Sequence, residues 1–298
     1  MARTKAISLI QSGSTKVDLA ELSGLVIENI QKEALSSGLK SQSYTGNPAA
    51  GSVEDKRFKN SASQAYGTAR TAGKGTALTI PPTVVNLDTH REIVEEAAKF
   101  DLDSFGVGNI MARRADNHVD TVAAELDAAF FAQAKSEGTA FTTSLTDIEE
   151  VAETLIQTLE TVKNDYVRGV PRNMIRLVLD PVYYGKLRSY LDKGVNNANV
   201  DTAAEDFAVF HGVRVYSSVN LPVTSAENSS DSGKTDTTTT HMIAMIEGAL
   251  AQPAVIYPYR EPEKIPLSND YGISMFFDYG TKALTPDLIF HLSTTVTA

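Results

Sequence analysis

The stretch from Asn109 to Glu137 constrains the fold most strongly, because it has the pattern of one long amphipathic helix. Apolar residues recur every three or four positions, which keeps them on one helix face, and no Pro or Gly interrupts the stretch. At about 1.5 Å per residue the helix would be roughly 40 Å long, which is typical of a helix that backs a sheet or spans a domain. The apolar face carries Met111, Ala115, Val119, Val122, Leu126 and Phe130, and the opposite face carries Arg113, Arg114, Asn117, Asp120, Glu125 and Asp127.

Composition excludes several classes of protein. The 298 residues suffice for two domains, or for one domain with long appendages. The net charge of −10 gives no broad attraction to phosphate backbones. The absence of cysteine excludes disulfides, thiolate metal sites and cysteine nucleophiles. The first ten residues lack the apolar core of a signal peptide, and no apolar run is long enough to cross a membrane. We therefore expect a soluble chain made in a cytoplasm.

The segments before the long helix differ sharply in character. Residues 17–35 have the pattern of a first amphipathic helix, in an arm that would pack on a neighbour. Residues 41–82 are rich in Gly, Ser, Ala and Thr, with frequent charges and few large apolar residues. This segment could be a disordered linker, or a two-stranded excursion whose partners lie on another chain. Residues 76–80 alternate like a strand that Pro81 and Pro82 would end.

The remaining pattern mixes helices and strands. Residues 84–87 suggest a strand, whereas the composition of residues 92–100 weakly favours a helix. After the long helix, a helix, a strand and a helix are expected at 146–165, 174–179 and 181–191. Residues 224–240 are almost purely polar and predict an exposed loop. Further strands are expected at 242–246, 255–259, 273–277 and 288–292. The fold class is therefore α+β, with a sub-domain inserted after the long helix.

No catalytic constellation is present in the sequence. The run from Gly73 to Thr76 lacks the glycine spacing and the following helix of a phosphate-binding loop. Of Asp116, His118 and Asp120, only the two aspartates share a helix face, so a solvated surface explains them better than a metal site does. We predict no catalytic residue, metal ligand or cofactor site. This absence favours a structural protein over an enzyme.

The order of the segments, together with several short motifs, resembles the major capsid proteins of tailed bacteriophages. An arm, a long polar excursion, a long helix, an inserted α/β sub-domain and a β-rich tail follow one another as they do in that family. Similar motifs include Val170-Pro171-Arg172, the step from Phe210 to Val215 that runs into Asn220-Leu221-Pro222, and the closing Tyr279-Gly280 and Pro286-Asp287.

The resemblance implies a tailed-phage capsid fold with four parts. These are an N-terminal arm at 1–42, an extended β loop at 43–83, a peripheral domain at 84–142 and 247–298 with its spine helix at 109–137, and an axial α/β domain at 143–246. It implies a chain that is no enzyme and that self-assembles, as pentamers and hexamers, into an icosahedral shell around double-stranded DNA without sequence-specific binding. It places the chain in the virion, after assembly in the host cytoplasm. Separate scaffolding, portal or decoration proteins would be further partners, and no membrane is involved.

The charged residues of the excursion are the candidate contacts with adjacent subunits. In a shell their blocks of charge would meet opposite charges on a neighbouring copy. Two alternatives to a phage capsid remain, namely an encapsulin-like nanocompartment shell that binds a cargo peptide, and a soluble α/β enzyme whose site leaves no local motif. The candidate subunit-interface residues are Lys56, Arg57, Lys59, Arg70 and Lys74.

Overall fold

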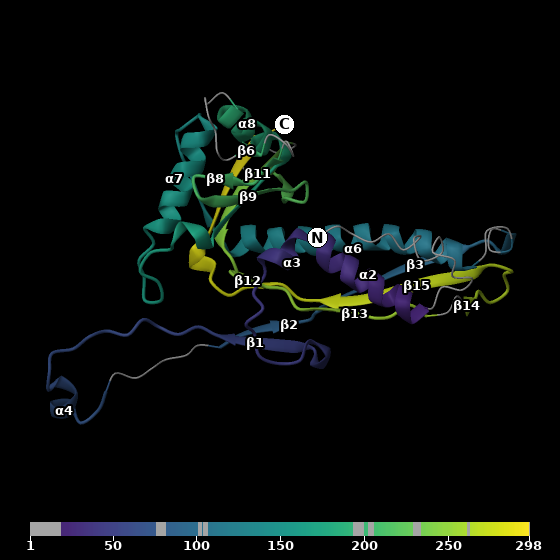
Figure 1. Cartoon of the computed structure of the whole chain (residues 1–298), viewed down its shortest axis with the longest axis horizontal. Coiled ribbons are helices and arrows are strands. Elements are labelled where there is room, and N and C mark those ends of the chain that lie inside the picture. Colours follow the sequence, from purple (N-terminus) through teal and green to yellow (C-terminus); the bar gives the residue numbers. More distant parts are fainter. Residues whose placement is uncertain are drawn as a thin grey trace.

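The computed structural model describes residues 19–75, 82–100, 103, 107–192, 200–201, 206–228, 234–260 and 263–297. The molecule is elongated (Figure 1). One long helix runs beside a narrow sheet, a second α/β unit sits at one end of this pair, and a thin excursion reaches away beneath that unit. No helix in these described ranges combines the length and the apolar character needed to cross a membrane.

The predicted long helix is confirmed as α6, Val107–Glu137. All six residues of its predicted apolar stripe are buried, with exposed fractions of 4% or less. The stripe from Met111 to Leu126 packs in one core cluster with Leu22, Val26 and Ile30 of α2, Leu19–Glu33, and with the buried face of a neighbouring sheet. The arm helix therefore packs on the spine of its own chain. It ends at Glu33, and after Ala34 the chain continues as the short helix α3, Leu35–Leu39.

The sheet beside α6 consists of strands far apart in the sequence. The nine residues of β3 pair antiparallel with all nine of β15, whose other side pairs with β13 and β14. The prediction of a helix at 92–100 is wrong over β3, because pairing with a partner about 180 residues away outweighs a weak local preference. The strands are β3, Thr89–Ala97; β13, Ala254–Ile256; β14, Glu263–Lys264; and β15, Tyr271–Tyr279.

The second unit is a mixed seven-stranded sheet covered by two helices. Along the main path β4, β17, β11, β5, β9 and β8 follow one another, and β10 pairs with the far end of β11. Its helices α7, Ile148–Glu160, and α8, Pro181–Asp192, confirm the predicted helices, and a separate apolar cluster fills the space between α7 and the sheet. The strands are β4, Thr139–Ala140; β5, Ile175–Leu179; β8, Val209–Phe210; β9, Val213–Ser217; β10, Val223–Glu227; β11, Thr235–Ile246; and β17, Ile289–Thr297. The observed architecture is α+β, as predicted.

One further sequence prediction needs correction in this unit. Within the segment 224–240, predicted as an exposed polar loop, residues 224–227 belong to β10 and residues 235–240 to β11, and Thr240 is 1% exposed. Threonine is β-branched and suits strands, so polarity alone misled the prediction. In addition, β17 pairs with β11 in this sheet, and Ile289 at its start also packs in one cluster with Phe130 and Phe131 of α6.

Two polar residues of α6 are buried, contrary to the predicted solvated face. His118 is 1% exposed, and its Nδ1 lies 2.6 Å from the hydroxyl oxygen of Tyr259. Its Nε2 lies 3.1 Å from Glu95 on β3, and burial lowers the pKa of His118. Asp127 accepts hydrogen bonds from the backbone N–H groups of Leu35 and Ser36, at 3.1 and 2.8 Å, and so anchors α3 to the spine helix.

The excursion begins and ends in a two-stranded ladder, β1, Ser52–Lys56, and β2, Pro82–Asn86. Val53 and Val85 face each other there and are buried against Ala251 and Leu284. The lack of a side chain at Gly280 allows its backbone to lie against the end of β2, since an added Cβ would lie 1.8 Å from the carbonyl oxygen of Asn86. The two-stranded alternative is thus the observed one at the base, and the predicted strand at 76–80 lies outside the described residues. Smaller pairings join β12, Leu250–Ala251, to β16, Lys282–Ala283, and β6, Val200–Asp201, to β7, Asp206–Phe207.

Candidate subunit interface

The five candidate interface residues separate into a proximal group and a distal group. Lys56, Arg57 and Lys59 lie at the base of the excursion, where β1 ends. Lys56 pairs with Glu54 of its own strand, at 3.2 Å, and both side chains are about half exposed. Arg70 and Lys74 lie at the far end, on and just after the short helix α4, Thr68–Ala72. Figure 1 shows that α4 stands far from the rest of the molecule.

Arg57 makes the strongest contact of the proximal group, and that contact lies within the chain. Its guanidinium binds both carboxylate oxygens of Asp287, with N–O distances of 2.5 and 2.9 Å. It also covers the ring of Tyr166, with 4.3 Å from Cζ to the ring centroid. The amide of Asn164 donates to the same carboxylate. Burial opposes ionisation of Asp287, but these hydrogen bonds outweigh it and lower the pKa of Asp287. We call Arg57, Tyr166 and Asp287 the latch.

A second set of contacts extends the latch along the excursion. Lys59 pairs with Asp165 at 2.9 Å, and the backbone N–H of Asn60 donates to the carbonyl oxygen of Asp165 at 2.7 Å. Arg168 donates to the carbonyl oxygen of Ser61 at 2.9 Å. The lysine pair is largely exposed, so solvent and salt weaken it. The backbone contacts nevertheless fix the direction in which residues 57–61 extend away from the rest of the subunit.

The loop that receives the excursion is held in shape by its own hydrogen bonds. It connects α7 to β5, and the side-chain oxygen of Asn164 accepts from the backbone N–H groups of Tyr166 and Val167 at 2.9 and 2.8 Å. Gly169, at φ +96°, allows the chain to turn back, because an added Cβ would lie 2.9 Å from the carbonyl oxygen of Glu160. Tyr166 is thereby presented to Arg57.

The distal part of the excursion is exposed to solvent in the described chain. Every residue from Phe58 to Gly75 is exposed except Gly67, which is intermediate. Tyr66 is 95% exposed and Phe58 59%, and Arg70 lies 5.9 Å from the centroid of the Tyr66 ring. Exposed aromatic side chains beside arginine are typical of protein interfaces. The distal group therefore has the chemistry of a contact surface that the single chain does not satisfy.

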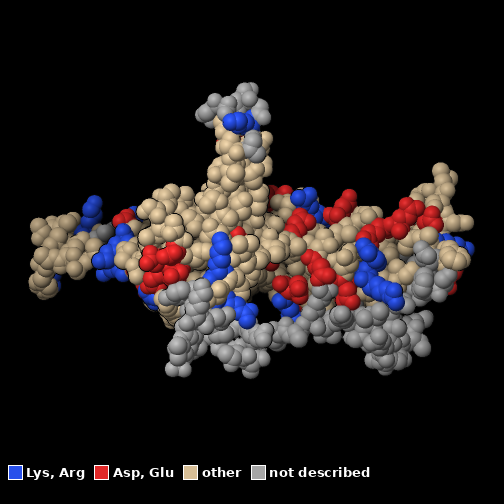
Figure 2. All heavy atoms as spheres, turned by 90° about the horizontal axis from the view of Figure 1, so that it is seen from above, with Lys and Arg blue, Asp and Glu red and all other residues tan. Residues whose placement is uncertain are grey.

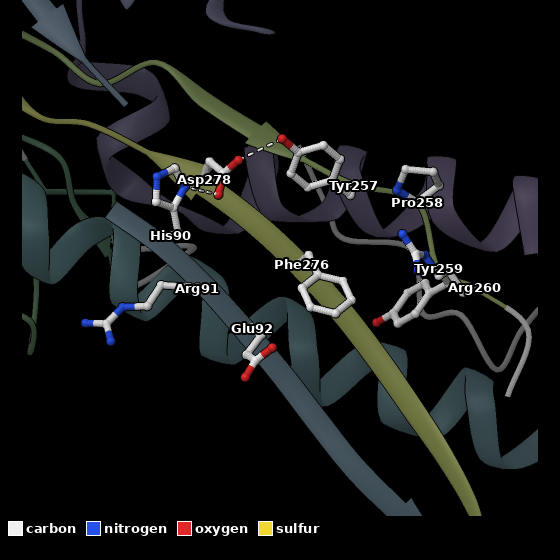
Figure 3. Close-up of a pocket in the computed structure, with 9 residues that line it drawn as sticks. All are labelled: His90, Arg91, Glu92, Tyr257, Pro258, Tyr259, Arg260, Phe276 and Asp278. Atoms are coloured by element: carbon white, nitrogen blue, oxygen red, sulfur yellow. Dashed lines mark hydrogen bonds and ion pairs between the residues drawn. The ribbon is translucent and has the colours of Figure 1, made fainter. Parts of the chain in front are cut away.

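A groove of about 730 Å³ lies on the outer face of the sheet formed by β3, β13 and β15 (Figure 3). His90 and Tyr257 reach Asp278 from two sides, each at 2.7 Å. The hydrogen bond to Asp278 raises the pKa of Tyr257, which makes this phenol a poor nucleophile at neutral pH. Phe276 lines the groove, with Arg260 5.9 Å from its ring centroid. The groove is thus lined by a mixture of aromatic and polar side chains. Among the described residues, no three His, Asp or Glu side chains gather as metal ligands would.

The sequence matches no protein-family model, and no curated protein is detectably similar to it. Solved structures do match in fold. The capsid structure of the cyanophage P-SCSP1u shares 16% identity over 87% of this chain and 87% of its own, with a TM-score of 0.60. A structure from Mycobacterium phage Che8 also shares 16% identity, over 94% of this chain and 92% of its own, with a TM-score of 0.56.

The chain has the fold of tailed-phage capsid proteins. The virus-like particle from Pyrococcus furiosus has it as well, with 13% identity over 92% of this chain and 98% of its own and a TM-score of 0.53. These matches span about nine-tenths of the chain, so the likeness concerns the fold as a whole rather than a single unit.

The structure adds partners that sequence reasoning did not find. Asp287 and Tyr166 were not among the candidate residues, and they lie 230 and 109 positions from Arg57. No local spacing links such positions. The only signal in the sequence was the motif Pro286-Asp287, which resembled the closing segment of capsid proteins.

Proposed function

We propose that this chain is the major capsid protein of a tailed phage and that it self-assembles, as pentamers and hexamers, into an icosahedral shell around double-stranded DNA. The observation that carries the proposal is the match to capsid structures over about nine-tenths of the chain and of its counterparts. A structural rather than catalytic role follows from this assignment. The place of action would be the virion, after assembly in a host cytoplasm.

We propose a division of the chain that follows the capsid arrangement. The arm would comprise 1–42, the extended loop 43–83, the peripheral domain 84–142 with most of 247–298, and the axial domain 143–246. We assign β17 to the axial sheet, because it pairs with β11 there. The distal residues Tyr66, Arg70 and Lys74 would contact an adjacent copy, while the latch would orient the loop toward that copy.

The charge distribution suits a shell that encloses DNA without binding it tightly. The chain carries 27 basic and 37 acidic residues. On the face shown in Figure 2, Lys and Arg side chains are interspersed with Asp and Glu, and the described residues form no broad basic area there. Tight sequence-independent binding to DNA depends on such an area. The proposed shell would therefore confine its genome mainly by closure.

Imaging of the purified full chain by negative-stain electron microscopy tests the proposal. We expect capsomers or closed particles, and a chain that stays monomeric at high concentration in several salt conditions would contradict it. The contents of particles recovered from a phage-producing host distinguish a phage capsid from a nanocompartment shell. Double-stranded DNA supports a phage capsid, whereas a packaged cargo protein would support a nanocompartment. The second class is less favoured, because phage capsids recur among the matched structures.

A further inference from the structure

A three-stranded ribbon extends beyond the core of the second unit. It consists of β10, residues 235–240 of β11 and residues 293–297 of β17, and we call it the Thr-rich ribbon. Both outer strands pair antiparallel with β11, which places Ser225 and Val296 level with each other on either side of Thr237. Nine of its sixteen residues are threonines: one on β10 at Thr224, five within 235–240 of β11, and three on β17 at Thr294, Thr295 and Thr297.

Side-chain hydrogen bonds make the ribbon rigid. The hydroxyl groups of Thr238 and Thr295 lie 2.8 Å apart, and those of Thr240 and Ser293 lie 3.1 Å apart. Thr297 donates to Asp236 at 2.6 Å, and this bond lowers the pKa of Asp236. The ribbon is therefore preorganised, so a partner strand would bind it with little ordering cost.

The two outer edges of the ribbon are open in the described part of the chain. β10 pairs only with β11, and β17 pairs beyond β11 only with β4, at Phe290 and His291. All five residues of β10 are exposed, as are residues 294–297 of β17. Val223 and Val296 expose 60% and 65% of their surface. Each edge thus offers about five residues of backbone to a further strand.

These edges lack the features that normally protect a free edge. Soluble proteins place charged residues, especially lysine, or proline on exposed edge strands. β3, which pairs only with β15 among the described strands, follows this rule with His90, Arg91, Glu92, Glu95 and Glu96. The outer strands of the Thr-rich ribbon carry one charged residue, Glu227, at the end of β10. The contrast within one molecule indicates that the ribbon edges are covered when the protein functions.

The direction of the strands identifies the occupant. Because β10 and β17 are both antiparallel to β11, they run parallel to each other. A copy rotated about an axis along the strands would bring its β17 beside the β10 of the first copy, in parallel register. The same step repeats around the axis until a ring closes, which is the head-to-tail interface of cyclic symmetry. Neither edge carries charge that would repel the other, apart from Glu227.

We propose that the β10 edge of one copy pairs in parallel with the β17 edge of the next, so that the Thr-rich ribbons form a closed β ring around each capsomer axis. This inference rests on the proposed function, which supplies the rotational symmetry. In this arrangement β10 and β17 of neighbouring copies meet at the axis, and backbone hydrogen bonds form the contact. Because the contact does not depend on particular side chains, the same strands could pair in rings of five or six copies.

Cysteine crosslinking tests the ring directly, because the chain contains no cysteine. Adjacent strands lie about 4.8 Å apart, within the range that a disulfide spans. We would combine Ser225→Cys with Val296→Cys and, in a second variant, with Thr294→Cys. The two pairs test two registers of β17 against β10, because a shift of two residues keeps both thiols on the same face of the sheet. Mild oxidation of assembled capsomers should give a ladder of covalent multimers with at least one of these pairs. Each single variant should stay monomeric on a denaturing gel.

The controls keep the inference apart from the proposed function. Ser225→Cys combined with Leu267→Cys, a fully exposed residue at the turn after β14, should give no ladder. A covalent dimer from Ser225→Cys alone would mean that two β10 edges meet by a two-fold axis, which would overturn the ring. Normal shells without any ladder would also overturn it, while the proposed function would stand. The absence of capsomers and shells would instead overturn the proposed function.

A charge on the edge provides a second test. Val223→Lys should protect the β10 edge and reduce the yield of capsomers at least tenfold, with unchanged helix content in circular dichroism. Val182→Lys is the matched control, because Val182 on α8 is 62% exposed and Val223 is 60% exposed. Equal capsomer yields from the two variants would contradict the edge pairing.

Discussion

Weakening the latch should release the excursion without unfolding the subunit. Arg57→Gln keeps most of the side-chain stem but removes the charge and the two-pronged contact with Asp287. The Arg57 and Asp287 side chains are 19% and 29% exposed, so solvent screens the pair only in part. Hydrogen bonds between charged groups contribute about 1.5–3 kcal/mol, and the contact with Tyr166 adds roughly 0.5–1 kcal/mol. We therefore expect local opening to become easier by about 2 kcal/mol.

Hydrogen exchange of the full-length, unassembled chain measures this opening. The reporter is the backbone N–H of Asn60, which donates to Asp165 next to the latch. A change of about 2 kcal/mol corresponds to exchange that is roughly 30-fold faster. The amides of β15, which lie in another part of the molecule, should keep their rates. Lys59→Ala should change the Asn60 rate little, because the pair of Lys59 with Asp165 is largely exposed.

The same experiment can refute the latch. If Asn60 exchanges at the same rate in Arg57→Gln as in the unmodified chain, the contact with Asp287 does not hold the excursion. Asp287→Asn removes the same charge pair from the other side while preserving the shape of the side chain. It should speed the exchange of Asn60 as Arg57→Gln does, which shows that the effect does not come from the introduced glutamine. Both variants should keep their helix content and their cooperative thermal transition, because residues 58–75 are exposed and contribute little to the core.

Three further predictions follow from the described contacts. Leu126→Asp places an unpaired charge on the buried stripe of α6, at a cost of several kcal/mol, and should give insoluble protein; normal solubility and an unchanged melting curve would show that the stripe is not buried. The hydrogen bond from Arg172 lowers the pKa of Glu153 to about 2, so its contribution is present above pH ~4.5 and lost as pH falls toward 2. Thermal melts of Glu153→Gln should accordingly show a loss of up to about 3 kcal/mol at pH 7 and a flatter pH dependence between those limits; an unaltered pH profile would contradict the pairing. Replacing residues 62–80 by a short Gly-Ser linker should leave a folded subunit that builds no shells, as judged by circular dichroism and electron microscopy; shells of normal size would exclude an interface role for that segment, and an unfolded product would place it in the subunit's own core.

The elements that sequence reasoning predicted well are those whose own pattern determines them. The stripe of α6 is local, so its spacing alone predicted both the helix and its buried face. The helices α7 and α8 and the strand β5 between them followed for the same reason. Their ends differ from prediction by a few residues, because hydrogen bonding and capping, rather than periodicity, decide where an element stops.

The elements that escaped prediction depend on distant partners. β3 is rich in Glu and favours a helix locally, but it forms a strand because β15 pairs along its whole length. His118 is buried because β3 and the segment around Tyr259 cover that side of α6. The latch joins residues 230 positions apart, which no spacing rule could detect. The capsid resemblance supplied the order of the parts, but it gave no information on these contacts.

The mass of the particles formed by the purified full chain tests the central claim most directly. A shell protein with the proposed interfaces should sediment as capsomers of several copies and, under assembly conditions, as closed particles of megadalton mass. The subunit itself has a mass of 32.1 kDa, so capsomers would be several times heavier than a monomer and closed particles orders of magnitude heavier. Sedimentation as a single species near 32.1 kDa, at high concentration and across several salt conditions, would contradict the account.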